Sequence, residues 1–350
     1  MYKVSKLQVN NDLKNFICEV PKAELHIHLE GSIEPETQLR IAERNQINLM
    51  YNSIEDIKKA YKFTDLRDFL NIYNQGTRIL KTEQDFYEIT LEYLVKAATQ
   101  NIKHAEVFID FQTYEKRNMP IEILMDGIRQ GIKTAKKEFG ISCYLILAFL
   151  RQLGPEAALK TLESSLKYKD DIVGIGLAAT EIGFPPELFA EVFERARKYG
   201  FRTTAHAGEE GPASYVKGSI DTLKVDRIDH GNKAMDDPML IDELIDRQIP
   251  LTLCPLSNIA LRNVGRLQDH TLKRKLDLGL LVSVNSDDPA YFGGYVNENL
   301  FAVAEELKLT VLDIKKLAEN SFISSFLPDD QKSHYINMVN ECFKISLNKN

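Results

Sequence analysis

The sequence is poor in cysteine and in long apolar runs, and each absence restricts what the protein can be. Its four cysteines (Cys18, Cys143, Cys254 and Cys342) are scattered and include no CxxC pair, so we expect reduced thiols and no disulfide framework. The longest wholly apolar run, 143–150, has eight residues, whereas a membrane-spanning helix needs about 20. The first 20 residues lack the continuous apolar segment of a secretory signal. We therefore expect a cytoplasmic protein that does not associate with membranes.

A concentrated positive charge, internal repeats and flexible linkers are also missing. The formal net charge is -7 and the pI is about 5.6, which argues against a nucleic-acid binder because that role needs a basic surface. A small-molecule substrate is favoured, and a homo-oligomer is compatible with this composition. No repeat, low-complexity tract or Gly/Ser-rich linker divides the chain. With 44% hydrophobic and 27% charged residues, the chain should fold by itself, and we predict one domain over residues 1–350.

Short apolar runs alternate with helix-like segments along most of the chain. A first strand is predicted at 23–29, where Glu24, His26 and His28 alternate with apolar residues and should therefore share one face. From Pro35 to about residue 100 the apolar spacing is helical, which predicts a helical insertion after this strand. Further strands are predicted at 103–109, 142–150, 171–178, 200–205, 226–229, 249–253 and 280–284.

Helices are predicted between these strands, and they complete the expected architecture. Their ranges are 121–139, 155–166, 186–199, 214–223, 238–247 and 267–278. Eight strands that alternate with helices predict an α/β fold of the (β/α)8 TIM-barrel type. The segment from about 297 to 347 also has helical character, and we expect these extra C-terminal helices to pack on the outside.

Four histidines and an aspartate occur at predicted strand ends. His26 and His28 are two residues apart on one strand, so both imidazoles project to one side and can hold a metal ion. Such a pair alone can also be structural, but His206 and His230 fall at strand ends too, where barrel active sites are built. Asp287 follows the eighth strand, which lies beside the first when a barrel closes. Three imidazoles and a carboxylate suit zinc with one position open for water.

Further side chains near this predicted metal site could carry a reaction. A divalent metal lowers the pKa of a bound water to about 7. Glu209 could protonate the group under attack, or it could be a solvated loop acid; Gly208 and Gly211 favour a tight turn with close approach of a ligand. His230 could hold or deprotonate the water, or be a buried structural histidine. Asp288 is either a substrate contact or a cap before a helix.

Five motifs make the sequence similar to the adenosine/adenine deaminase family of the amidohydrolase superfamily. They are PKAELHIHLEGS at 21–32, TAHAGEEGP at 204–212, RIDHG at 227–231, LCPLSN at 253–258 and VNSDDPAYFGGY at 284–295. The resemblance extends from about Pro21 to Leu327. It implies a hydrolytic deaminase of a 6-aminopurine.

The resemblance also implies a role for each side chain at the site. It implies one zinc ion per chain, held by His26, His28, His206 and Asp287. Glu209 would protonate purine N1, His230 would activate the water, and Asp288 would contact purine N7. An enzyme that hydrolyses another bond, such as an amide, is disfavoured because no lysine is placed to bridge a second metal ion.

Position 30 bears on which purine is the substrate. Nucleoside deaminases of this family usually have Asp where this chain has Glu30, a position associated with ribose binding, and the longer side chain would crowd that space. Three of the motifs (RIDHG, CPLSN and DDPAYFGGY) also resemble the adenine deaminase branch. The resemblance therefore implies conversion of adenine and water to hypoxanthine and ammonia, with adenosine as the alternative.

Three loops depart from that branch, near Phe111, Ala178 and Leu261. The branch typically reads FFDPQ-T-H where this chain has residues 108–114, FIDFQTY, and GLDSSE where it has residues 176–181, GLAATE. The segment after LCPLSN, residues 259–264, also differs. These departures leave open a modified 6-aminopurine as substrate, or an inactive purine-binding relative.

Overall fold

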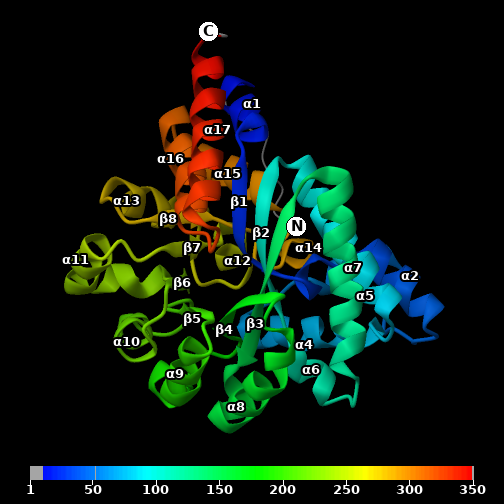
Figure 1. Cartoon of the computed structure of the whole chain (residues 1–350). Helices are drawn as coiled ribbons and strands as arrows, with labels where there is room; N and C mark the ends of the chain where they lie inside the picture. The colour runs from blue at the N-terminus through cyan, green and yellow to red at the C-terminus, as the bar shows by residue number, and fades with distance from the viewer. Residues whose placement is uncertain (1–10, 52, 349–350) are drawn as a thin grey trace.

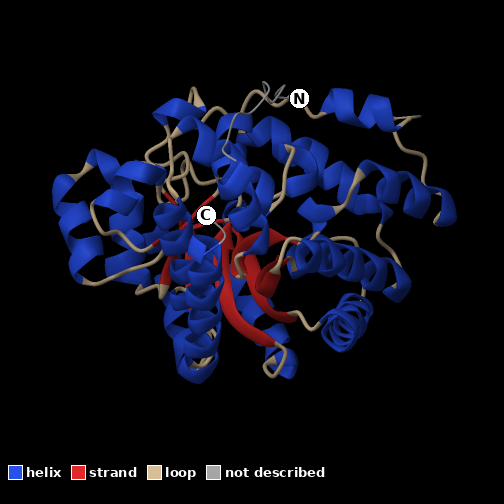
Figure 2. Ribbon diagram, turned by 90° about the horizontal axis from the view of Figure 1, so that it is seen from above, coloured by secondary structure: helices blue, strands red, loops and turns tan. Residues whose placement is uncertain are grey.

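In this computed structural model, which describes residues 11–51 and 53–348, eight parallel strands form a nearly closed barrel inside a layer of helices (Figures 1 and 2). The strands are β1 (Lys22–His28), β2 (Ile102–Ile109), β3 (Ser142–Leu150), β4 (Ile172–Ala178), β5 (Arg202–Ala207), β6 (Arg227–His230), β7 (Leu251–Leu253) and β8 (Val282–Val284). Each strand pairs in parallel with the next. A parallel bridge from Ile27 to Asp287 brings the segment after β8 beside β1. The predicted TIM barrel is confirmed.

Helices follow the strands as predicted. They are α7 (Ile121–Phe139), α8 (Gly154–Ser165), α9 (Ala190–Lys198), α10 (Ala213–Gly218), α11 (Pro238–Asp246) and α13 (Leu272–Asp277). Three short helices were not predicted, because four to six residues are too few to show helical periodicity: α6 (Phe111–Glu115), α12 (Pro255–Ala260) and α14 (Pro289–Phe292). Single 3-10 or π turns are η1 (Glu30–Ser32), η2 (Thr77–Ile79), η3 (Arg151–Leu153), η4 (Leu166–Tyr168), η5 (Pro186–Phe189), η6 (Ser219–Leu223), η7 (Asn232–Asp236) and η8 (Leu267–Asp269).

The predicted insertion after β1 is helical. It contains α2 (Pro35–Arg44), α3 (Ile54–Ala60), α4 (Leu66–Gly76) and α5 (Glu83–Thr99). Helix α5 packs closely on α7, where a Cβ atom added to Gly127 would lie 2.3 Å from the carbonyl oxygen of Glu83. Helix α4 belongs to a separate apolar cluster, in which Leu66 and Phe69 pack with Tyr291 and Phe292 of α14. This cluster holds α4 beside the segment that follows β8.

The C-terminal segment is helical and packs on the outside of the barrel, as predicted. It contains α15 (Val296–Glu306), α16 (Val311–Ile323) and α17 (Asp329–Asn348). Helix α16 covers the junction of β1 and β8: Ser321 Oγ accepts the N–H of Ala23 and Asn320 Nδ2 donates to the carbonyl of Val282, both at 2.9 Å. Helix α1 (Asn11–Glu19) was not predicted and lies beside α17 (Figure 1), with the Phe16 and Phe343 ring centroids 6.1 Å apart.

The structure bears on the expectations about a secretory signal and about membrane spans. No secretory signal was expected in the first 20 residues, and residues 1–10 of that stretch lie outside the described residues. Within the described part of the chain, no helix combines the length and apolar character that a membrane span requires.

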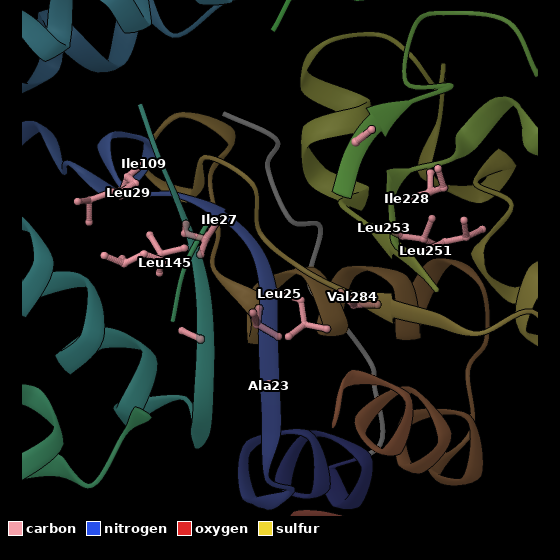
Figure 3. Packing of buried hydrophobic residues seen from close by; sticks show 14 of the residues in the cluster. Ala23, Leu25, Ile27, Leu29, Ile109, Leu145, Ile228, Leu251, Leu253 and Val284 are labelled. Atoms are coloured by element: carbon pink, nitrogen blue, oxygen red, sulfur yellow. The ribbon is translucent and has the colours of Figure 1, made fainter. Parts of the chain in front are cut away.

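The barrel wall separates two apolar layers. Alternate residues of β1, such as Leu25 and Ile27, lie in the main core. This core extends to Leu251 of β7 and Val284 of β8 (Figure 3). A smaller cluster contains Phe108 and residues of β3 and β4. Because strand side chains alternate in direction, the second set faces the barrel interior.

One expectation about β1 is wrong: Glu24 does not join the two histidines. The pairing of β1 with β2 shifts register between Glu24 and Ile27, so strict alternation does not hold across this segment. The Glu24 carboxylate instead accepts hydrogen bonds from Tyr93 of α5, at 2.8 Å, and from Ser286. Burial raises the pKa of Glu24 to about 7. Its contact with Ser286 holds the segment that carries Asp287.

An ion pair lies inside the barrel near the starts of the strands. Arg227, the first residue of β6, is fully buried, and its Nη1 lies 2.6 Å from Glu106 Oε2. Its Nη2 donates to the Leu25 carbonyl at 3.1 Å, and its guanidinium lies 4.4 Å from the centroid of the Phe326 ring. Although burial favours the neutral acid, Arg227 and then His104 hold the pKa of Glu106 below its usual value. This pair joins β1, β2 and β6.

We predict that Glu106→Ala destabilises the protein strongly. The substitution leaves Arg227 buried without its carboxylate partner, a loss that typically costs about 3–5 kcal/mol of unfolding free energy. Urea unfolding followed by circular dichroism measures the change. The matched control is Glu122→Gln, which removes an exposed partner of Lys167 and should leave the unfolding midpoint almost unchanged. Equal, small shifts in both variants would contradict the prediction.

Candidate active site

The residues predicted to carry chemistry lie where the strands end. His28 and His230 are the last residues of β1 and β6, and His206 is next to last in β5. The backbone of His230 (φ 66°) and of Asp287 (φ 65°) is in the left-handed region, which costs about 1–3 kcal/mol for a non-glycine residue. Strain of this kind is typical of functional sites, where the surrounding structure fixes an unfavourable backbone.

Four of these side chains converge on one point. His28 Nε2 lies 3.2 Å from His206 Nε2 and 3.5 Å from Asp287 Oδ1, and His26 Nε2 lies 3.3 Å from the same oxygen. One ligand atom of each of the four residues is within 4.8 Å of all the others. The structure therefore brings together the set predicted from the sequence, namely His26, His28, His206 and Asp287.

A buried carboxylate below the cluster contacts two of its imidazoles, His26 through Thr252 and His206 directly. Asp229 accepts the hydroxyl proton of Thr252 at 3.0 Å, so the Thr252 oxygen must accept from His26 Nδ1, also at 3.0 Å. Asp229 Oδ2 lies 3.4 Å from His206 Nδ1 and also accepts from Thr204 at 2.7 Å. His26 thus carries its proton on Nδ1 and turns Nε2 toward the cluster, while His206 Nδ1 faces the same carboxylate at an ion-pair distance.

The protonation of the cluster also suits a cation. Burial lowers the pKa of His28 to about 3 and lowers the pKa of His206, so these imidazoles are neutral at pH 7. Although burial favours neutral Asp287, the neighbouring histidines, His26 first, hold its pKa well below the usual value. His26 Nε2 is buried and has no hydrogen-bond partner. Although burial lowers it, the charge of Asp287 raises the pKa of His26 above its usual value, so this imidazole releases a proton when a cation binds. Three imidazole nitrogens and one carboxylate oxygen form a donor set that fits zinc.

Glu209 is a buried acid beside this cluster. Its side chain is 4% exposed, and Oε2 lies 3.5 Å from His230 Nε2. Burial, and then the charges of Asp287 and Glu181, raise the pKa of Glu209 well above its usual value. A solvated loop acid is therefore excluded, and at neutral pH this side chain carries a proton that it can donate.

His230 lies between Glu209 and the cluster of candidate metal ligands. Its Nε2 is 3.8 Å from Asp287 Oδ2 as well as close to Glu209. Burial and then the charge of His26 lower the pKa of His230 well below its usual value. The ring is neutral and can accept a proton at Nε2. It is buried, but it faces the reactive groups rather than the apolar core.

The side chain of Asp288 does not cap the helix that follows it. Asp288 precedes α14 but makes no side-chain bond to its first turn. Its Oδ1 is buried without a hydrogen-bond partner, and its side chain lines the same cavity as Glu209. Burial, followed by the charge of Asp287, raises the pKa of Asp288 well above its usual value. Of the two roles left open by the sequence, the cap is wrong and the contact to a ligand is favoured.

The cavity above the cluster is closed on one side by Glu30. This side chain is 3% exposed and accepts hydrogen bonds from Tyr114 at 2.7 Å and Tyr73 at 3.4 Å. Burial and the charge of Asp110 raise its pKa to about 7. Tyr114 occupies the position at which the similar branch has His. The Glu30 carboxyl group that lines the cavity is therefore already hydrogen-bonded to two tyrosines.

The three divergent loops contribute differently to the cavity. Ala178 and Leu261 line it, whereas Phe111 is fully buried in the main core. Asn263, in the divergent segment after β7, donates from Nδ2 to Glu209 Oε1 at 3.3 Å. Phe108, Ile109 and Asp110 of the first divergent segment line the cavity as well. All three divergent segments thus reach the ligand space directly, and the first also holds Glu30 through Tyr114.

Several residues that organise the site were not predicted from the sequence. Asp229 gave a usable signal, because it stands next to His230 inside the RIDHG motif. Thr252 gave none, since a threonine in a strand is ordinary. Cys254 also lies close to His26 and His230, but burial raises the pKa of its thiol well above the usual value, so it remains protonated and is a weak ligand.

Comparisons with known proteins agree with this geometry. The family model described as adenosine deaminase matches residues 21–342. An adenine deaminase of Crocosphaera subtropica is 51% identical over 320 residues, 91% of this chain and 98% of that protein. The crystal structure of adenine deaminase from Arthrobacter aurescens has a TM-score of 0.91 at 44% identity, covering 93% of this chain and 99% of that one. An amidohydrolase from Burkholderia ambifaria with bound Zn has a TM-score of 0.90 at 28% identity, covering 99% and 96%.

We predict that Asp229→Asn weakens metal binding. The amide cannot accept from every donor that the carboxylate serves, so the two imidazoles lose their fixed orientation. The affinity for zinc should fall about 10–100-fold, as for other partners of metal-binding histidines. Competition against a chromogenic chelator measures it, with Asp226→Asn at the opposite end of β6 as control. Equal affinities in the two variants would contradict this role of Asp229.

Proposed function

Because the chain belongs to the adenosine deaminase family and is a hydrolytic purine deaminase, we propose that it converts free adenine and water to hypoxanthine and ammonia with one bound zinc ion. The observation that carries this proposal is the buried cavity that unites Glu209, His230 and Asp288 with the four-residue donor set. The relatives named adenine deaminase, at 51% and 44% identity, support the free base as substrate.

The wall formed by Glu30 favours the free base over the nucleoside. In adenine, N9 carries a proton where adenosine has a sugar, so the base needs less room and offers one more donor. Glu30 is buried and held by two tyrosines, which restricts the space for a ribose. Opening that space would break hydrogen bonds to a buried carboxyl group, which is costly.

The zinc ion would be held by His26, His28, His206 and Asp287. When bound, it supplies Lewis-acid chemistry that makes a water nucleophilic at neutral pH. Asp229 and Thr252 keep the His26 imidazole in the tautomer that this binding needs, and Asp229 also faces His206 Nδ1.

The remaining side chains would bind the base and move protons. Glu209 donates its proton to purine N1, which makes C6 more electrophilic. His230 accepts a proton from the attacking water and returns it to the departing amino group. Asp288, kept neutral by burial, donates a hydrogen bond to N7 and orients the ring. The C6–O bond forms first, which makes C6 tetrahedral, and the C6–N bond then breaks as ammonia leaves. The proton on the new C6 hydroxyl returns to Glu209, so that C6 becomes a carbonyl and the enzyme is regenerated.

Two other substrates remain as alternatives to adenine. Adenosine would require Glu30 to move, and a 6-aminopurine modified on its amino group would have to fit beside the divergent residues Ala178 and Leu261. An inactive purine-binding relative is disfavoured, because every proposed catalytic side chain is present and buried at the site. The cytoplasmic location and a homo-oligomer stay predictions from the sequence.

We expect the zinc-loaded protein to deaminate adenine, with kcat/KM at least about a hundredfold above that for adenosine, a ratio within the reach of one binding pocket. Ultraviolet absorbance and ammonia release measure both reactions. Chelation should abolish turnover and added zinc should restore it. Faster turnover of adenosine would favour the nucleoside instead, and no turnover of either by zinc-loaded protein would overturn the proposal.

Glu209→Gln should lower kcat about 10²–10⁴-fold, the usual contribution of a general acid, while zinc content stays the same. The amide keeps the size of the side chain but has no acidic proton. Glu210→Gln, at the neighbouring and half-buried acid, is the control and should change kcat little. Steady-state kinetics measure kcat for both variants, with the zinc content of each preparation determined beforehand. Full activity of Glu209→Gln would remove this residue from the mechanism.

A further inference from the structure

The loop that carries Glu209 surrounds a second buried carboxylate. Glu181, which follows β4, is 0% exposed. Its Oε1 accepts the N–H of Gly208 at 2.6 Å, and its Oε2 accepts those of Glu209, Glu210 and Gly211 at 3.0, 2.9 and 2.8 Å. Four consecutive backbone donors thus point at one side chain. Such a ring of N–H groups is a strong anion site, and here a side chain of the protein fills it.

A buried cation holds the same loop from its other end. Arg151, in η3 after β3, is 0% exposed and donates from Nη2 to the carbonyl of His206. Its Nη1 donates to the carbonyl of Phe184, in the loop after β4, at 2.6 Å. The guanidinium of Arg151 therefore fixes this loop at the carbonyl of His206. The carboxylate of Glu181 fixes it at the N–H groups of residues 208–211.

The two glycines of this loop fit closely around Glu181. Gly208 has φ of 68°, a backbone conformation that favours glycine. A Cβ atom at Gly211 would lie 2.6 Å from Glu181 Oε1. At Gly211 the loop can approach the carboxylate because this position carries no side chain, whereas a Cβ atom at Gly208 would meet Val216 Cγ2 at 2.6 Å. The close approach that Gly211 suggested is therefore an approach to Glu181, and Gly208 provides the left-handed turn before it.

We propose that Glu181 is a positioning residue that fixes the backbone of residues 208–211 and thereby aims the Glu209 carboxyl at the substrate. This inference rests on the proposed role of Glu209 as proton donor. Glu181 also adds a negative charge near Glu209, which helps to keep that acid protonated. Glu181 is the one acid of residues 176–181.

Glu181→Gln tests the proposal with little change of volume. One carboxylate oxygen becomes an NH2 group, so at least one loop N–H meets a donor instead of an acceptor. We expect kcat for the substrate that the wild-type protein deaminates to fall about a hundredfold. A loss of this size is typical when a catalytic group, here the Glu209 carboxyl, is misplaced by about 1 Å. KM and zinc content should stay close to wild type.

A matched control separates positioning from general loss of stability. Asp85 is another buried carboxylate that accepts two backbone N–H groups, those of Lys81 and Thr82, both at 2.8 Å. It lies at the start of α5 and does not line the cavity. Asp85→Asn should lower the melting temperature but keep kcat. Equal losses of kcat in Asp85→Asn and Glu181→Gln would overturn the proposal.

A double substitution tests whether Glu181 acts through Glu209. In protein that already carries Glu209→Gln, adding Glu181→Gln should lower the residual kcat no further, because the group being positioned is gone. Rates are measured at high enzyme concentration over hours. If Glu181→Gln costs the same factor with and without Glu209, the positioning role is wrong.

Amide hydrogen exchange of residues 208–211 gives a readout that needs no substrate. Exchange should be at least about tenfold faster in Glu181→Gln than in wild type or Asp85→Asn, because the N–H groups lose their acceptor. Unchanged exchange would overturn the proposal even if kcat falls. If zinc-loaded wild type deaminates no 6-aminopurine, the proposed function fails, and the exchange experiment still decides whether Glu181 holds the loop.

Discussion

The pairing of β1 with the segment after β8 is the constraint on which the site depends. Asp287 donates its N–H to His26 O and accepts the N–H of His28 on its own carbonyl, both at 3.0 Å. These two backbone bonds bring residues some 260 positions apart in the chain into register. A slip of one residue would turn the side chains of one strand to the other face of the wall. The fold thus assembles the metal-type donor set by closing the barrel.

Burial gives these polar groups their chemical character. Ion pairs and hydrogen bonds fill the barrel from Glu106 and Arg227 near the strand starts to Asp229 and the histidines near the strand ends. Each charge is surrounded by partners, as burial requires. At the mouth the balance changes, because Glu209 and Asp288 have few donors around them and the nearby charge is negative. Low polarity and like charge therefore keep both acids protonated where the ligand would bind.

The sequence allowed the strand order and the chemistry of the mouth to be predicted, because periodicity and strand ends are local features. His26, His28 and His206 were assigned from their position on predicted strands, and Asp287 from barrel closure. Glu24 was misplaced because a register shift cannot be read from alternation. Glu181 and Thr252 were missed because their importance lies in partners more than 20 positions away. The sequence identified Glu209, but the carboxylate beneath its loop required coordinates.

One wall of the cavity is built differently from the rest. Helix α4 contributes Leu66 and Phe69 to this wall, and these side chains pack with Tyr291 and Phe292 of α14 in an apolar cluster separate from the main core. The groups that would hold metal and move protons, by contrast, stand at the ends of strands packed in the main core or within a few residues after them. The path by which a base enters and ammonia leaves can therefore change its amino acids without altering the strands beneath, so substrate range and reaction chemistry can diverge independently.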